Sequence, residues 1–288
     1  MTWQISILLH SLLAAYSVII VKKLSSKGNK YVYSVLFFSF LAEWLAGIIF
    51  VKIFLEDRII LDWDPIIYSQ LLAGGVLFGL VNFLAFEVYK HLSASVGSIS
   101  MASNRIAVVL MAVIFLNEKL TFIQVIGIII MLGAIVLATY KKSYKNVANN
   151  AYTYFILIVA AFAYGFATIN EKDLLDKMGV ANYLVLGWGF QVLAVSSLVL
   201  LRRKKWLLPD RSTFIPFISL VLLFGVSGGL FITSLVGSDS SSITVSLAGL
   251  KVILSVILAY ILLKERSNFR RLLASSCLSF LGIILLLS

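Results

Sequence analysis

The chain has 288 residues, of which 61% are apolar and only 13% are charged. Soluble domains carry about 25% charged residues, so this composition, with a mean hydropathy of +1.02, excludes an ordinary soluble domain. We expect a multi-pass membrane protein whose surroundings are the lipid bilayer. The net charge of +11 does not indicate a nucleic-acid partner, because most of the cations lie in short loops between apolar runs.

Ten apolar stretches are long enough to cross a bilayer, which takes about 20 residues in a helix. They predict an all-α integral membrane protein with ten transmembrane helices. The expected spans are 3–21, 31–55, 66–89, 92–116, 121–140, 151–170, 180–201, 212–236, 243–263 and 268–288.

The two halves of the chain resemble each other. The polar segment 141–150 divides the spans into two sets of five, residues 1–145 and residues 146–288. At an offset of 147, segment 93–119 matches segment 240–266 with eight identities in 27 positions, including serines and a glutamate in register. We interpret this as an internal duplication.

A duplicated unit with five spans must be inverted relative to its copy, and the loop charges agree with this topology. Seventeen Lys and Arg residues fall in loops on one side of the membrane and five in loops on the other. The positive-inside rule makes the side with 17 cations cytoplasmic, so both termini are expected outside. Inverted repeats of this kind are a transporter architecture with a substrate site near the midplane.

Short motifs recur before and after the fourth span of each half. They are LSASVGSI at 92–99 and SDSSSITV at 238–245 before the span, and a glutamate followed by a basic residue within 117–120 and 264–267 at its end. With these motifs, the whole chain resembles the drug/metabolite transporter superfamily in its ten-span EamA-like form. The resemblance implies a transporter in a prokaryotic plasma membrane and, from the family's usual orientation, cytoplasmic termini. The family commonly has a proline near the middle of the fourth span, where this chain has Arg105 and Val252.

Arg105 and Lys251 are the only basic residues deep inside apolar stretches. A cation at the bilayer centre costs about 2.5–3.5 kcal/mol on insertion scales, so such residues mark a functional site by default. They lie on equivalent spans, one position out of register, and Asn104 is the exact counterpart of Lys251. We predict that Arg105, Lys251 and Asn104 bind an anionic group of a substrate, because an Arg fork and a Lys point charge both suit carboxylate or phosphate. The alternative is that the cations only tie the bundle together.

Other polar residues share this depth in the predicted spans. Glu43 is expected to pair with Arg105 or Lys251, or to meet an amino group of the substrate, and Gln191 is a further predicted contact. His10 and Glu43 are candidates for proton coupling.

Aromatic residues are expected to cover the rest of the substrate. Tyr16 and Tyr164 are approximate repeat counterparts at an offset of 148, and Trp188 lies between two glycines. We predict that these three side chains line the cavity.

The leading hypothesis is a secondary transporter that moves a small anionic or zwitterionic metabolite, an amino acid first, by alternating access. One alternative substrate is a phosphorylated metabolite, a nucleotide sugar or a lipid-linked intermediate. Another alternative is a non-transporting assembly protein or a scramblase.

No phosphate-binding loop, HExxH, GxSxG or paired-carboxylate motif occurs, so we expect no enzyme. A single cysteine and two histidines indicate no metal and no cofactor, and we expect a monomer.

Overall fold

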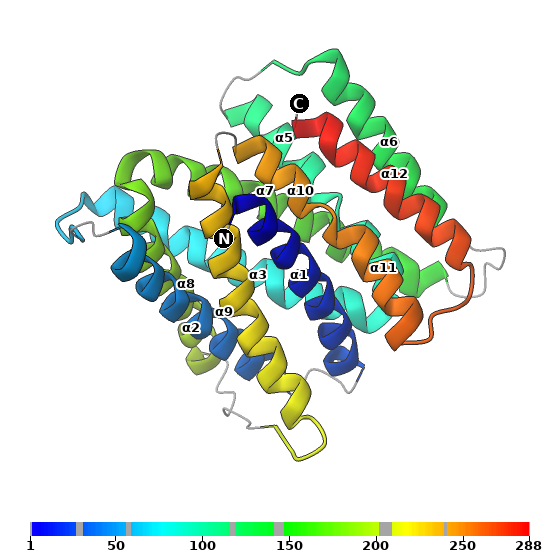
Figure 1. Ribbon diagram of the computed structural model, residues 1–288, viewed down its shortest axis with the longest axis horizontal. Helices are drawn as coiled ribbons and strands as arrows, with labels where there is room; N and C mark the ends of the chain where they lie inside the picture. Colours follow the sequence, from blue (N-terminus) through cyan, green and yellow to red (C-terminus); the bar gives the residue numbers. More distant parts are fainter. Residues whose placement is uncertain are drawn as a thin grey trace.

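The computed structural model describes residues 2–26, 31–55, 59–115, 119–140, 147–201, 209–238 and 241–287, and every regular element in these ranges is helical (Figure 1). The elements are α1 (Trp3–Ser25), α2 (Val32–Phe50), the π-helical turn η2 (Val51–Leu55), α3 (Pro65–His91), α4 (Ala94–Met101), α5 (Asn104–Phe115), α6 (Phe122–Thr139), α7 (Val147–Asn182), η3 (Tyr183–Gly187), α8 (Trp188–Leu201), α9 (Phe214–Gly237), α10 (Ser241–Ala248), α11 (Lys251–Leu262) and α12 (Phe269–Leu287).

The described helices form nine stretches that are long and apolar enough to cross a membrane. The longest, Ala151–Leu200, contains two of the predicted spans. Gly179 separates them, because its φ of 75° leaves the helical region at a position where glycine has no steric cost. The all-α, ten-span prediction is therefore confirmed.

The spans assemble into two groups joined by two central helices. α2, α3, α8 and α9 contact one another, and so do α4, α6, α11 and α12, while α1 and α7 contact both groups. Each group mixes helices from the two halves of the chain, as shown by α2 beside α8 and α6 beside α12 in Figure 1.

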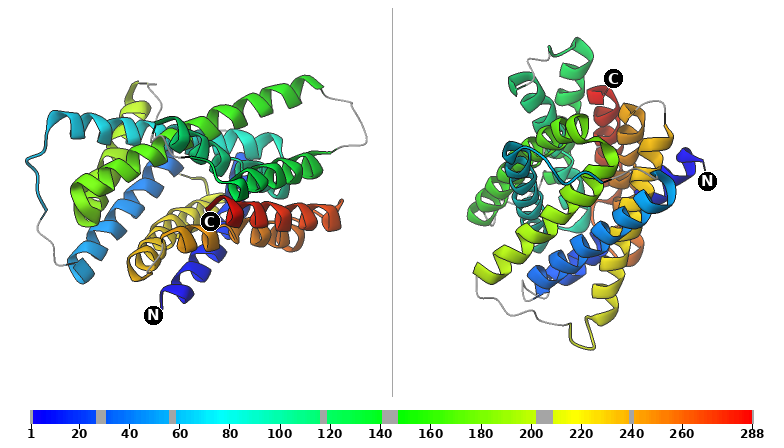
Figure 2. Two further views of the ribbon diagram at one scale, coloured as in Figure 1. Left: turned by 90° about the horizontal axis from the view of Figure 1, so that it is seen from above. Right: turned by 90° about the vertical axis from the view of Figure 1, so that its left-hand side faces the viewer.

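Equivalent helices of the two halves run in opposite directions. On α6, Gly127 packs against Gly282 and Leu286 of α12, whereas Leu137, further along α6, shares a groove with the earlier Leu278. Both views in Figure 2 show these two helices lying side by side. The inverted relation expected from five spans per half is thus present in the packing.

Small residues allow the closest helix contacts. A Cβ at Gly75 of α3 would lie 2.7 Å from the Phe190 carbonyl oxygen of α8, and one at Gly225 of α9 would lie 3.0 Å from the Ala42 carbonyl oxygen of α2. Larger side chains at these positions would separate the backbones, which is why small residues are favoured at membrane helix interfaces.

The fourth span of each half is broken near its middle. The chain leaves the α-helix between α4 and α5 at Ala102 and Ser103, and between α10 and α11 at Gly249 and Leu250. At an offset of 147 these two breaks are in exact register. Tighter i to i−3 bonds span them, such as the Arg105 N–H to the Ala102 carbonyl at 3.1 Å. The sequence analysis did not predict either break, although Asn104, Arg105 and Lys251 follow directly after them.

One end of the bundle, which we call the basic face, is formed by the ends of α1 and α3, the residues just before α2 and α9, and the segment after α11. Lys22 at the end of α1 donates to the carbonyls of Tyr89 and Leu92 at the end of α3, at 2.7 and 2.8 Å. Tyr31, before α2, donates to Asp210, before α9, at 2.7 Å. These contacts place the loops after α1 and α3 and the loop before α9 together, as the charge count predicts.

Glu265 closes the same face between the two broken spans. Its carboxylate accepts bonds from the N–H groups of Ala94 and Ser95 and from the Ser95 hydroxyl, at 2.8, 3.1 and 2.8 Å. Glu265, three residues after the end of α11, therefore caps the first turn of α4, so the two broken spans are antiparallel. Its repeat counterpart, Glu118, lies outside the described residues.

Candidate functional site

A cavity of about 350 Å³ lies between the two groups of helices. Helices α1, α2, α3, α5, α7, α8, α9 and α11 all contribute side chains to its wall. The volume is in the range that holds a small metabolite. Seven of the nine site residues predicted from sequence line it: His10, Glu43, Asn104, Arg105, Tyr164, Trp188 and Lys251.

The broken spans deliver the two cations to this cavity. Arg105 is the second residue of α5 and Lys251 is the first residue of α11. The backbone stays hydrogen-bonded at both helix starts, where the N–H groups of Arg105 and Val252 donate to the Ala102 and Gly249 carbonyls at 3.1 and 3.0 Å, so the positive charge comes from the two side chains. The wall around them therefore favours an anionic group.

Tyr164 orients Arg105. The guanidinium carbon lies 5.4 Å from the centroid of the Tyr164 ring, a cation–π distance, and the same ring makes an edge contact with Phe78 of α3. Arg105 also interacts electrostatically with Glu171 and Lys251. The guanidinium is thus fixed by its neighbours in a way that a flexible ammonium is not.

The expected pairing of Glu43 with a cation is wrong. No ion pair within 4.0 Å joins Glu43 to Arg105 or Lys251, all of which are described residues. Glu43 instead packs on α9, where a Cβ at Gly228 would lie 3.1 Å from its Oε1. Equal depth in the membrane predicted the pairing, but depth does not fix which face of a helix a residue occupies.

Tyr16 is the second predicted residue that lies elsewhere. Its side chain is 40% exposed and does not line the cavity. At the true repeat offset of 147 the counterpart of Tyr164 is Ser17, which does line the cavity. One residue of misregister turns a helical position by about 100°, and that rotation carries Tyr16 to the outer surface.

His10 and Trp188 are held by local contacts in the wall. The Nδ1 of His10 lies 2.9 Å from both the carbonyl oxygen and the hydroxyl of Ser227 on α9, and its ring centroid lies 5.1 Å from that of Phe231. The Trp188 ring packs against Gly47, where a Cβ would approach it to 2.8 Å.

Gln191 is buried but lies behind the cavity wall rather than in it. Its side chain lies near Tyr183, which in turn interacts electrostatically with a carboxylate that the sequence analysis did not select.

Glu171 is that missed residue. It lies in Asn170-Glu171-Lys172-Asp173, which looks like the polar end of a span, but α7 continues as far as Asn182. Glu171 is seven residues after Tyr164 and so shares its helix face. That spacing is the sequence signal that could have identified it.

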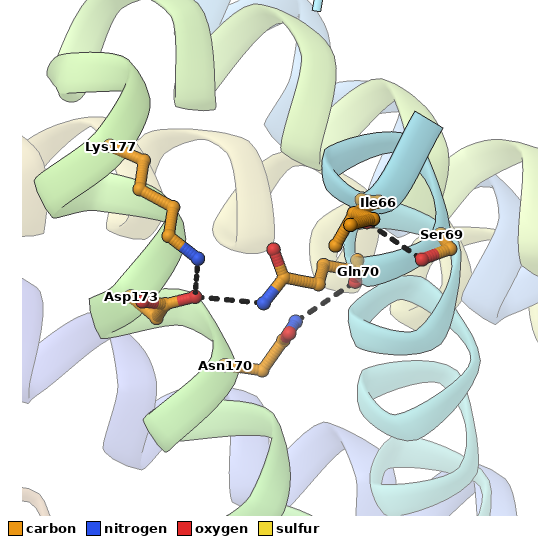
Figure 3. A network of polar contacts seen from close by, with 6 residues as sticks. All are labelled: Ile66, Ser69, Gln70, Asn170, Asp173 and Lys177. Carbon is orange, nitrogen blue, oxygen red and sulfur yellow. Dashed lines mark hydrogen bonds and ion pairs between the residues drawn. The ribbon is translucent and has the colours of Figure 1, made fainter. Parts of the chain in front are cut away.

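Neighbours of Glu171 on α7 bind to α3 (Figure 3). Asp173 accepts a bond from the Gln70 side chain of α3 at 2.7 Å and pairs with Lys177, while Asn170 donates to the Gln70 carbonyl at 2.9 Å. This network fixes α7 on α3 and leaves Glu171 as the carboxylate of this stretch that interacts with Glu43 and Arg105.

Inverted helical repeats around a cavity that charged side chains line are features of transporters. The model of the EamA-like transporter family matches residues 1–140 and again residues 151–288. The chain belongs to this family, within the drug/metabolite transporter superfamily, and is a multi-pass membrane transporter.

Two further likenesses agree with the family. An "Uncharacterized transporter" of Archaeoglobus fulgidus is 32% identical over 120 residues, which are 38% of this chain and 41% of that protein's length. A solved crystal structure with 14% identity has a TM-score of 0.63 over 96% of this chain and 94% of that chain, which shows the shared fold alone.

Proposed function

We propose that the protein transports a small zwitterionic metabolite, with amino acids as the first candidates, by alternating access. The observation that carries the proposal is the balance of charge at the cavity. Arg105 and Lys251 lie in its wall, and Glu43 in the wall and Glu171 next to it supply two carboxylates. Two cations with one carboxylate would favour a substrate with a net negative charge. Two cations with two carboxylates suit a substrate that carries one negative and one positive group.

The substrate carboxylate would bind to the side chains of Arg105 and Lys251. The substrate ammonium would bind to Glu43. Asn104 adds an acceptor, because its Oδ1 is buried and has no hydrogen-bond partner among the described residues. A bound N–H donor would remove the cost of leaving that oxygen unsatisfied.

Apolar and aromatic residues complete the wall. Phe78, Trp188 and Phe231 are among the large ones, and they would cover a nonpolar substrate side chain. A phosphorylated metabolite is the second candidate, because two cationic side chains suit phosphate. Glu43 and Glu171 oppose it, since a dianion would be repelled by them.

Alternating access would proceed by rocking the group of α2, α3, α8 and α9 against the group of α4, α6, α11 and α12 around the site. At the basic face Lys22 donates to the Tyr89 carbonyl and Glu265 accepts from the Ala94 N–H, and these bonds would have to break for the cavity to open there. We place the basic face on the cytoplasmic side of a prokaryotic plasma membrane and propose that a monomer is the working unit.

A thermal-unfolding screen of the purified protein against amino acids, phosphorylated metabolites and nucleotide sugars would identify the substrate. A ligand at 100 times its Kd adds about 2.7 kcal/mol of stability. Flux of the selected solute is then measured in proteoliposomes for Arg105→Ala, Lys251→Ala and the exposed control Lys52→Ala.

We expect each cavity variant to lower flux about 10- to 100-fold, because a hydrogen bond to a charged group contributes about 1.5–3 kcal/mol. Lys52→Ala should retain flux, and all three proteins should remain monodisperse. Wild-type flux in both cavity variants would refute this site. Stabilisation by phosphorylated solutes alone would refute the zwitterion.

A further inference from the structure

A second hollow, of about 260 Å³, lies between residues 108–113 of α5, residues 168–172 of α7, the start of α6 and the end of α12, and we call it the far pocket. It lies toward the end of the bundle opposite the basic face, because α5 and α7 both run away from that face. α5 follows α4, whose first turn is capped at the basic face by Glu265. The end of α7 meets the segment before α3, where the Ile60 N–H donates to the Oδ1 of Asn182 at 2.8 Å.

The far pocket continues the cavity along two helices. On α5, Arg105 lines the cavity, and Val108 and Val109 line the far pocket. On α7, Tyr164 lines the cavity and Thr168 lines the far pocket. Residues three and four apart share a helix face, so both hollows lie along the same faces of the same two helices. One helical turn, about 5.4 Å of rise, separates their walls on each helix.

The cavity itself extends in the other direction. Its wall follows α1 from His10 to Val21 and α3 from Phe78 to Tyr89, and both helices end at the basic face. The cavity therefore extends from the charged residues toward the basic face, and the far pocket extends toward the opposite end. Together the two hollows mark a route across the bundle that passes Arg105.

The polar side chains that line the far pocket are all hydrogen-bond donors, and among its described residues none is acidic. They are Lys119, Gln124, Thr168 and Lys172. The rest of the described wall is apolar. A carboxylate or a phosphate is the ligand group that such a set of donors suits.

Thr168 and Gln124 are placed to donate into the far pocket. The Thr168 hydroxyl is buried and has no hydrogen-bond partner among the described residues. A threonine in a helix often bonds back to the carbonyl four residues earlier, as Thr139 does to Ile135 at 2.8 Å, and Thr168 does not. The Oε1 of Gln124 accepts from the Thr121 N–H at 3.0 Å, which fixes the amide and leaves its N–H groups as donors. A bound anionic group would accept from both side chains.

A packing defect would have a different character. Cavities that stay empty in proteins are apolar, whereas a polar hollow of this size holds water or a ligand. α5 and α7 also pack closely beside the far pocket, since a Cβ at Gly165 would lie 3.0 Å from the Ala107 carbonyl oxygen. The far pocket is therefore a shaped recess next to a close helix contact, and the two helices are not loosely packed.

We propose that the far pocket is the entrance of the transport route at the end opposite the basic face, and that Lys119, Gln124, Thr168 and Lys172 form a peripheral site for the anionic group of the substrate. The proposal rests on the transport function proposed above. The substrate carboxylate would bind there first and then pass along α5 to Arg105, one helical turn from the pocket wall. The phosphate of a lipid headgroup has the same chemistry and is the competing occupant.

Cysteine chemistry tests the far pocket directly, because Cys277 is the chain's one cysteine and Cys277→Ser gives a cysteine-free protein. In that background Val109→Cys places a thiol in the pocket wall, and Val113→Cys, one turn further along α5, is a second reporter. Leu110→Cys is the matched control, since Leu110 lies on the exposed face of the same helix. Each protein, in phosphatidylglycerol liposomes and in lipid-free detergent, is treated with an anionic and a cationic methanethiosulfonate that do not cross membranes.

We expect both pocket thiols to react, the anionic reagent faster, and the Leu110→Cys thiol to stay unreactive in liposomes. Lys119→Gln combined with Lys172→Gln should lower the ratio of anionic to cationic rates about tenfold, because positive charges in a cleft raise the local concentration of anions. Lys177→Gln should leave the ratio unchanged, since Lys177 pairs with Asp173 at the surface of the same helix. A merely structural role of the two lysines would change both rates together.

Flux and equilibrium binding test whether the far pocket lies on the route. Modification of Val109→Cys should stop flux of the transported solute in proteoliposomes. The double lysine variant should raise the solute concentration for half-maximal flux about three- to tenfold and leave the Kd of the central site within about twofold of wild type. The peripheral site changes how fast the solute arrives, whereas the Kd reports the equilibrium contacts at Arg105 and Lys251.

Several results would overturn the proposal. Pocket thiols that react with neither reagent would show that no aqueous entrance exists. An unchanged charge ratio in the lysine variant would exclude the anion site, and full flux after modification would show that the pocket is not on the route.

Thiols that react in detergent but not in phosphatidylglycerol liposomes would show that a lipid headgroup occupies the far pocket, which also overturns the proposal. Thiol reactivity is measured without substrate. Failure of the proposed function, in which no zwitterionic solute binds or is transported, is therefore a separate result.

Discussion

The two broken spans have the same architecture but carry different cations. Each has a short half-helix of eight residues, α4 or α10, followed by a half-helix of 12 residues, α5 or α11. The breaks are in exact repeat register, yet Arg105 and Lys251 are one position out of register. Duplication preserved the broken backbone, and the side chains have diverged around it.

The difference lies in how each cation is held. Arg105 stacks on Tyr164 and interacts with Glu171, so its fork has a fixed direction. Among the described aromatic rings none stacks on Lys251, whose nearby charged groups include Arg105. We infer that the first half supplies a rigid, directional anion contact and the second half an adjustable point charge.

Exchanging the two cations tests this difference most strongly. Arg105→Lys should raise the substrate Kd about 10- to 100-fold, because both the bidentate fork and the ring contact are lost. Lys251→Arg should change the Kd less, since a positive charge is kept and no directed contact is removed. Titration calorimetry on both variants checks this, and equal losses would show that the two cations have equivalent roles.

The break in the second half should tolerate less change than the break in the first. Ala102 is the repeat counterpart of Gly249, but a Cβ at Gly249 would lie 2.9 Å from the Ser246 carbonyl oxygen and 3.1 Å from Ile283. Gly249→Ala should therefore lower the free energy of unfolding by about 1–2 kcal/mol through overpacking. Ala102→Gly should cost less, about 0.5–1 kcal/mol. Thermal unfolding in detergent compares the two, and a Gly249→Ala protein as stable as wild type would contradict this description of the break.

Much of the fold could be predicted from the chain, because hydropathy reports the spans and the loop charges report the topology. The cavity residues were found for a related reason: a charge such as Arg105 is costly in a bilayer, so its presence indicates a site. The rotation of a helix and the continuity of its backbone leave no hydropathy signal. For that reason the Glu43 pairing and the place of Tyr16 were wrong, and the breaks and Glu171 were missed.

The cap on the first broken span should contribute a smaller amount. Glu265→Gln keeps the shape of the side chain but removes its charge and one of its two acceptor oxygens at the start of α4. We expect a loss of about 1 kcal/mol of stability, as for other helix N-caps, and faster opening of the basic face. Thermal unfolding and the rate of substrate release measure the two effects. Ser95→Ala removes only the hydroxyl bond and should have less effect; a larger effect than Glu265→Gln would show that the cap is not the main contact.

The smallest expected effect concerns the one hydroxyl pair that joins the two broken spans directly. Ser255 of α11 donates to Ser98 of α4 at 2.6 Å, and both side chains are buried. Hydrogen bonds between membrane helices contribute about 0.6 kcal/mol on average, so Ser255→Ala should cost about that amount. A double-mutant cycle with Ser98→Ala isolates the pair, because the second substitution should then cost almost nothing.

Ser275→Ala is the matched control, since that hydroxyl bonds only to the Arg271 carbonyl of its own helix. Additive losses in the cycle would mean that the broken spans are held together by Glu265 and by packing, and that this hydroxyl pair does not couple them.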